Sequence, residues 1–270
     1  METQKDLAIV LKSIQFEERH RIITGLTQTY GLISAIARNS VQSRRFGGSL
    51  DLFTASDWTL GFKPHSELAQ LTQAQVRHSF ENLRKNFEHY ALASTVTEFL
   101  LRLAPQNEPC LDLFQLHSNA LFSLNHTQDL GTPLVFLNAY LAKLLQWSGQ
   151  QPQLNGCLEC SITLETLESG NRVSCLIANA AWICASCLKV YGNKQQGEEP
   201  SLPSHSVTAR ALRDFKLSLR TPIRQVLHST EASSAEHQEL YDWIYSLFIY
   251  HIPGFDQKPM KTLRFLSVRG

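Results

Sequence analysis

Four of the six cysteines in this 270-residue chain lie in two CxxC pairs. Cys157 and Cys160 form the first pair, Cys184 and Cys187 form the second, and 23 residues separate the pairs. Each CxxC turn places two sulfur atoms on one side of an ion, and two such turns supply the tetrahedron that Zn²⁺ prefers. The spacing predicts one structural zinc ion per chain, because four protein ligands leave no open position for catalysis.

Other interpretations of the cysteines remain open. Reduced cysteine packs well as a small hydrophobic side chain, so the four residues could simply be buried. A redox role is weaker, because two CxxC pairs exceed what a thioredoxin-like site needs. Cys175 lies between the pairs and could replace a ligand, although a core position is the simpler interpretation, and Cys110 is interpreted as a buried helical cysteine. The HxE elements of the chain are not followed by PCxxC, which argues against a zinc deaminase.

The stretch IARNSVQSRRFGGSL, residues 36–50, is basic and contains no acidic residue. Arginine presents a planar fork to phosphate oxygens, and an aromatic side chain such as Phe46 offers a stacking face, so the stretch suits a nucleic acid. The candidate DNA-binding residues are Arg38, Arg44 and Arg45, with Lys12, Arg19 and Arg21 extending the patch. A solvated turn is the alternative, in which Glu17 and Glu18 would neutralise their basic neighbours.

The elements that carry these residues differ between the two parts of the chain. Runs of β-branched and aromatic residues at 7–16, 19–28, 30–40 and 49–62 predict short strands and a small barrel or sandwich. From about residue 70 the apolar residues recur at helical steps, and helices are predicted through most of the remaining chain. The segments 161–168 and 172–178 are expected to form a hairpin around Ser169-Gly170-Asn171, between the two cysteine pairs.

Composition excludes several classes of protein. The formal net charge of +1 neither favours nor excludes an anionic partner. A secretory signal and a membrane-spanning run are both missing, so we expect a soluble, intracellular protein that does not bind a membrane. The sequence contains neither a P-loop nor a dinucleotide fingerprint, which predicts a protein that is not an enzyme and works without ATP.

The order of these features resembles the RecO family of bacterial recombination mediators. The segment AIVLKS…FEERHRIITGLTQTYGLISAIARNS…SRRFGGSLDLF resembles the opening of that family, and the downstream helices and two CxxC pairs follow in the same order. The resemblance implies an N-terminal OB-fold β-barrel followed by an all-α domain with an inserted zinc knuckle. The expected domains are 1–80 for DNA binding and 81–270 for the helical part, which includes the knuckle at 154–192.

The resemblance also implies a function in DNA repair and recombination. It implies binding to single- and double-stranded DNA, annealing of complementary strands, and partnership with RecR and with the C-terminal tail of single-stranded DNA-binding protein (SSB). Together these partners help to load RecA, and the expected location is the bacterial cytoplasm, on the nucleoid. A protein-interaction scaffold that zinc stabilises, without direct DNA binding, is the alternative.

This chain departs from the family pattern at three places. One is the turn after Asn39, where Val41 and Gln42 stand in place of the positive charge that is common in the family. Arg38-Asn39 stands where the family usually has lysine and glycine, and Ala180-Ala181 stands where two glycines usually precede the second CxxC pair. We therefore expect weaker DNA affinity and a differently shaped zinc hairpin.

Overall fold

The structure is a computed structural model that describes residues 3–41, 43–63, 66, 68–194, 204–227, 229–255 and 258–266, with the backbone alone at 191–194. The chain divides into two compact units. The first unit comprises Met1–Thr127 with Met260–Phe265, and the second comprises Gln128–Pro259 with Leu266–Gly270. A late segment of the chain thus returns to the unit that the N-terminal half forms.

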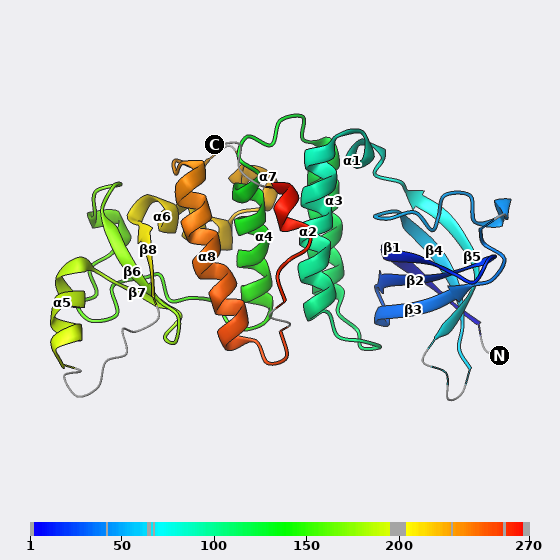
Figure 1. Ribbon diagram of the computed structural model, residues 1–270, viewed down its shortest axis with the longest axis horizontal. Helices are drawn as coiled ribbons and strands as arrows, with labels where there is room; N and C mark the ends of the chain where they lie inside the picture. Colours follow the sequence, from blue (N-terminus) through cyan, green and yellow to red (C-terminus); the bar gives the residue numbers. More distant parts are fainter. Residues whose placement is uncertain are drawn as a thin grey trace. The chain divides into compact units, whose positions relative to one another are not determined.

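The first unit contains a closed five-stranded barrel (Figure 1). Its strands, in chain order, are β1 (Thr3–Phe16), β2 (His20–Thr27), β3 (Gly31–Ala37), β4 (Ala55–Gly61) and β5 (Ala69–His78). They close in the order β1-β2-β3-β5-β4, with every neighbouring pair antiparallel except β3 and β5. This order is that of an OB-fold, which confirms the barrel predicted for the N-terminal part.

Small and branched side chains fill the barrel around one tryptophan. Trp58 of β4 is fully buried, and its indole Nε1 donates to Ser56 Oγ at 3.2 Å. A Cβ atom at Gly25 of β2 would overlap the Trp58 ring, so glycine is required there. Because side chains alternate between the two faces of a strand, the neighbours of the core residues point outward.

Strand β5 corrects the prediction of helix from about residue 70. Ala69 and Leu71 are buried in the barrel core, and the register with β4 then shifts between Leu71 and Gln73. After this bulge Ala74 packs against the core, whereas Gln73 and Gln75 are exposed, so alternation continues with the faces exchanged. The ladder with β4 satisfies the backbone of this segment. Helical spacing of apolar residues begins only after Phe80.

Three helices complete the first unit: α1 (Glu81–Lys85), α2 (Phe87–Leu103) and α3 (Leu111–His126). The helical run breaks between α1 and α2 because the side chain of Asn86 accepts from the backbone N–H groups of Glu88 and His89 and starts a new helix. On α2, the carboxylate of Glu98 accepts from the backbone of Lys261 and Thr262 at 3.1 Å each. This contact holds the late segment of the chain on α2.

The second unit combines helices with a small sheet (Figure 1). Strand β6 (Arg172–Leu176) lies between β7 (Ala181–Ile183) and β8 (Ser204–Thr208). The helices are α4 (Pro133–Trp147), α5 (Ala185–Lys194), α6 (Ala209–Arg220), α7 (Ile223–Val226) and α8 (Ser234–His251), and the short 3-10 turns of the chain are η1 (Arg44–Phe46), η2 (Leu164–Thr166) and η3 (Leu263–Leu266). Within the described residues, no helix is both long and apolar enough to cross a membrane.

The hairpin between the cysteine pairs forms one segment later than predicted. Strand β6 pairs with β7 across the turn at 177–180, and β8 occupies the other edge of β6. The segment 161–168 contains η2 instead of a strand, and the carbonyl oxygens of Leu164 and Leu167 accept from the guanidinium of Arg213. Both edges of β6 are taken, so 161–168 cannot pair with it.

A buried carboxylate fastens α6 to the start of α8. Ser233 and Glu236 form a reciprocal capping box at the N-terminus of α8, and Glu236 also accepts from Arg210 Nε at 2.9 Å. Burial disfavours the ionised carboxylate, but hydrogen bonds from Ser233, Arg210 and Thr208 outweigh it and lower the pKa of Glu236 to about 2.

Replacing Glu236 by glutamine should destabilise the protein by roughly 2 kcal/mol at neutral pH, because the cap survives but the charge is lost. The depressed pKa stabilises the folded state above the unfolded pKa of about 4.5, and this stabilisation is lost as pH falls through about 2. Denaturant unfolding at several pH values should therefore show the two proteins converging below pH 4. A constant difference across that range would contradict the assignment.

Candidate nucleic-acid interface and metal centre

The connection between β3 and β4 carries the three leading arginines. Arg44 and Arg45 lie in η1, where the hydroxyl of Ser43 accepts from the backbone N–H of Arg45 at 3.2 Å. The guanidinium of Arg45 donates to the carbonyl oxygen of Arg38 at 3.2 Å. All three side chains are exposed, so the structure brings them together at one end of the barrel.

The tip of the β1–β2 hairpin lies against the same connection. The backbone N–H of Val41 donates to the carbonyl of Arg19 at 3.2 Å, and that of Asn39 donates to His20 Nδ1 at 2.9 Å. Arg21 stands opposite Ala37 in the ladder. Arg19 and Arg21 thus join the end of the barrel that carries Arg38, Arg44 and Arg45, which we call the arginine end.

Lys12 lies apart from the arginine end. It stands opposite Thr24 on the outer face of β1, β2 and β3, and it lines a cavity of about 270 Å³ beside α2. The structure therefore brings five of the six candidate residues together and separates the sixth.

The basic side chains are not neutralised by their neighbours. None of the carboxylates in the described part of the chain forms an ion pair with any of the six candidates. Glu17 lies 3.5 Å from His20 Nε2 instead of pairing with an arginine. The alternative in which acidic residues of the hairpin mask Arg19 and Arg21 is therefore not what the structure shows.

The expectation that Phe46 offers a stacking face to a base is wrong. Phe46 is 3% exposed and belongs to the barrel core, with Arg45 lying over its ring. Ile14 and Phe16 were missed: they are 46% and 41% exposed on the outer face of β1, and Phe16 stands opposite His20. Their alternation with Lys12 in the sequence was the signal, because residues two apart on a strand share a face.

The departure at Asn39 has a simple backbone explanation. Asn39 has φ of 52°, which lies in the left-handed region. Asparagine tolerates this conformation better than most residues because its short polar side chain can hydrogen-bond locally. The turn can therefore form with asparagine at this left-handed position.

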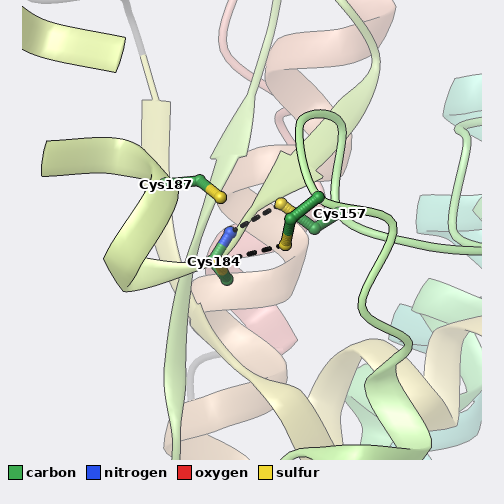
Figure 2. A group of neighbouring side chains, drawn as sticks. Cys157, Cys184 and Cys187 are labelled. Carbon is green, nitrogen blue, oxygen red and sulfur yellow. Dashed lines mark hydrogen bonds between the residues drawn. The ribbon is translucent and has the colours of Figure 1, made fainter. Parts of the chain in front are cut away.

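The two CxxC pairs converge in the second unit (Figure 2). Cys157 and Cys160 lie in the loop before η2, Cys184 directly follows β7, and Cys187 lies in the first turn of α5. The four sulfur atoms all lie within 4.8 Å of one another. Cys175 is fully buried on β6 and Cys110 precedes α3, and neither belongs to this cluster.

The local backbone is shaped to hold the cysteine cluster. The N–H of Leu158 donates to the carbonyl of Trp182 at 2.9 Å, which ties the first pair to β7. The N–H of Cys184 donates to the sulfur of Cys157 at 3.3 Å (Figure 2). A Cβ atom at Gly156 would lie 2.8 Å from the carbonyl oxygen of Ser161, so glycine allows the first turn to close.

The geometry and acidity of the cluster fit a tetrahedral metal site. Ligand sulfurs at about 2.3 Å from a zinc ion stand about 3.8 Å apart, and the sulfurs of Cys160 and Cys184 are 3.8 Å apart. Burial opposes ionisation of Cys157, but backbone N–H groups lower its pKa to about 7. Hydrogen bonds with Cys160 and Cys184 raise the pKa of Cys187 to about 12. Four thiolates this close can coexist only around a cation.

Together these features define a protein with an OB-type barrel, an arginine-rich barrel end and a four-cysteine cluster in its helical part. The family described as recombination protein O N terminal matches residues 1–80, and recombination protein O C terminal matches residues 84–258. The chain therefore belongs to the RecO family of DNA repair proteins.

Individual relatives agree with the family match. The chain is 26% identical over 262 residues to DNA repair protein RecO of Syntrophus aciditrophicus, which covers 97% of this chain and 95% of that protein. It is 26% identical over 216 residues to the protein of the same name from Rhodopirellula baltica, covering 75% of this chain and 78% of that one. The identity to the Anaeromyxobacter dehalogenans protein is 32% over 162 residues, or 59% and 62% of the two chains.

Replacing Ala180 by glycine should stabilise the protein by about 1 kcal/mol, because Cβ penalises left-handed backbone. Ala180 ends the turn before the second cysteine pair with φ of 45°. Ala178 lies in the same turn and is not among the described residues with positive φ, so its replacement by glycine is the matched control and should destabilise slightly. Thermal unfolding measures both, and equal effects of the two substitutions would contradict the argument.

Proposed function

We propose that this protein is a recombination mediator that binds single- and double-stranded DNA through the arginine end of its barrel. Residues 1–80 would form the DNA-binding domain. The observation that supports the proposal is the gathering of Arg19, Arg21, Arg38, Arg44 and Arg45 with no ion-paired carboxylate among the described residues. Uncompensated guanidinium groups on a small barrel suit a phosphate backbone.

The proposed activity is the annealing of complementary strands. Two single strands repel each other through their phosphates, and binding to a cationic surface reduces this repulsion so that bases can pair. Ile14 and Phe16 of β1 provide exposed apolar surface beside the arginines, on which a base can stack. Charge neutralisation and stacking need neither ATP nor a catalytic group, so the proposed role is not enzymatic.

Membership of the RecO family supports a proposal about partners. We infer that the protein acts with RecR and with the C-terminal tail of SSB to help load RecA onto SSB-covered single strands. This work would take place in the bacterial cytoplasm, on the nucleoid. The barrel surface and the helical unit are both candidates for these contacts.

We infer that the four-cysteine cluster holds one structural zinc ion. Thiolates are the ligands that Zn²⁺ prefers, and four of them leave no position for water or substrate. The ion would tie the loop before η2 to β7 and α5, which stabilises the second unit without chemistry at the metal.

The purified protein should contain about one zinc ion per chain. Replacing Cys157 and Cys184 by serine should remove the metal and lower the melting temperature, and a chelator should lower that of the wild type similarly, because structural zinc contributes folding energy. Cys110→Ser is the control: this cysteine lies outside the cluster, so the variant should keep its zinc. Equal melting temperatures with and without chelator would overturn the assignment.

Replacing Arg44 and Arg45 by alanine should weaken binding of a single-stranded oligonucleotide roughly 10- to 100-fold at low salt. The slope of log affinity against log salt should become shallower by roughly 1.4, because each lost phosphate contact on a single strand removes about 0.7. Fluorescence anisotropy at several salt concentrations measures both quantities.

The matched control removes two exposed arginines from the second unit, with Arg220→Ala and Arg224→Ala, and should leave the slope unchanged. If the wild type fails to bind DNA at low salt, the scaffold function becomes the better description.

One observation favours that scaffold function. Exposed apolar side chains lie in or next to the two CxxC pairs and offer surface to a protein partner, namely those of Leu158, Ile162, Leu188 and Val190.

A further inference from the structure

The outer face of β1, β4 and β5 forms a polar groove, of which the proposed function uses only Arg45. The groove has a volume of about 930 Å³ and opens on the side of the barrel. Amide, hydroxyl and charged side chains dominate its lining, with Leu7 and Ala74 as the apolar members. The lining residues from the strands include Lys5, Asp57, Thr59, Gln73, Gln75 and Arg77.

The ladder arranges these side chains in two rows. Lys5 stands opposite Thr59, and Thr59 stands opposite Gln73, which gives the first row across three strands. The second row runs from Leu7 through Asp57 to Gln75. Residues directly opposite each other share a face of the sheet, and Trp58 between the rows points into the core, so both rows point outward.

The acidic residues of the groove already have partners. Asp57 forms an ion pair with Arg77. The carboxylate of Asp6 accepts from the backbone N–H groups of Leu7 and Thr29, each at 2.9 Å. Lys5 and Arg45 have no ion pair with a carboxylate of the described residues, so the groove keeps available positive charge.

Arg45 belongs both to the groove and to the arginine end. It lines the groove and also donates to the carbonyl of Arg38. A polyanion held at the arginine end would therefore lie next to a second surface rich in hydrogen-bonding groups. The chemistry of that surface matches a nucleic-acid strand, whose phosphates contact cations and whose sugars and base edges exchange hydrogen bonds with amides and hydroxyls.

We propose that this groove holds a second single strand of nucleic acid while the arginine end holds the first. The inference rests on the proposed function, because a second strand matters only if the protein binds a first one. Two strands bound side by side on one barrel, with Arg45 between them, would meet at high local concentration and pair. A protein partner suits the groove poorly, because the centre of a protein interface is enriched in aromatic and other apolar anchors.

The test places negative charge in the groove without changing side-chain shape. Gln73→Glu and Gln75→Glu replace two exposed amides by carboxylates, which would repel a phosphate backbone. Binding of one labelled oligonucleotide should stay within about two-fold of wild type, while uptake of a second, non-complementary labelled strand, seen by energy transfer, should fall roughly 10-fold. The annealing rate of complementary strands should fall by the same factor.

Two further variants make the result decisive. Gln115→Glu with Gln151→Glu adds the same charge at exposed glutamines outside the groove and should behave as wild type. Lys5→Gln removes a groove cation from an exposed position and should show the same loss of second-strand uptake. It therefore tests the groove even where the glutamate variant is unstable.

The outcomes separate this inference from the proposed function. Wild-type annealing and second-strand uptake by the groove variant would overturn the second-strand site, and so would an equal loss of first- and second-strand binding, since the groove would then belong to a single DNA path. Loss of RecR binding with unchanged annealing would make the groove a protein interface. A wild type that binds no first strand would instead overturn the proposed function.

Discussion

The alternation of side chains around a closed barrel is the constraint on which the proposed nucleic-acid surfaces of this protein depend. Trp58 fills the interior and requires glycine at position 25, so the register of β1, β2 and β4 is fixed by the core. Once the core residues point inward, their neighbours must point outward in rows. The groove on β1, β4 and β5 and the exposed Ile14 and Phe16 are the outward halves of that arrangement.

Backbone groups, not carboxylates, position the arginines. The carbonyl of Arg38 accepts from Arg45, the carbonyl of Arg19 accepts from Val41, and His20 accepts from the backbone of Asn39. A carboxylate that accepted these hydrogen bonds would neutralise the positive charge of the arginines, whereas a neutral backbone carbonyl leaves that charge available for the proposed phosphate contacts. In the cysteine cluster, too, backbone N–H groups and not a basic side chain lower the pKa of the Cys157 thiol.

Local patterns predicted the parts of this protein that local chemistry determines. The CxxC spacing identified the four clustered cysteines, because each pair sits in a single turn. The strands of the barrel were also recognisable, apart from β5, whose polar outward residues Gln73 and Gln75 hid its period. Features that depend on contacts between distant segments could not be predicted. The hairpin between the cysteine pairs is shifted because β8 pairs with one edge of β6. Phe46 is buried because it packs with the core residues of the barrel. The groove is likewise invisible in the sequence, since its rows exist only in the register of three strands.

The contact between Glu98 and the segment after Pro259 has a consequence for how the protein is made. The backbone of Lys261 and Thr262 completes the hydrogen bonding of a carboxylate on α2, although 162 residues of chain lie between Glu98 and Lys261. During synthesis on the ribosome the barrel and its helices emerge first, and this contact can form only after residues 261 and 262 have been made. A nascent chain stalled before residue 260 would leave Glu98 without those backbone donors.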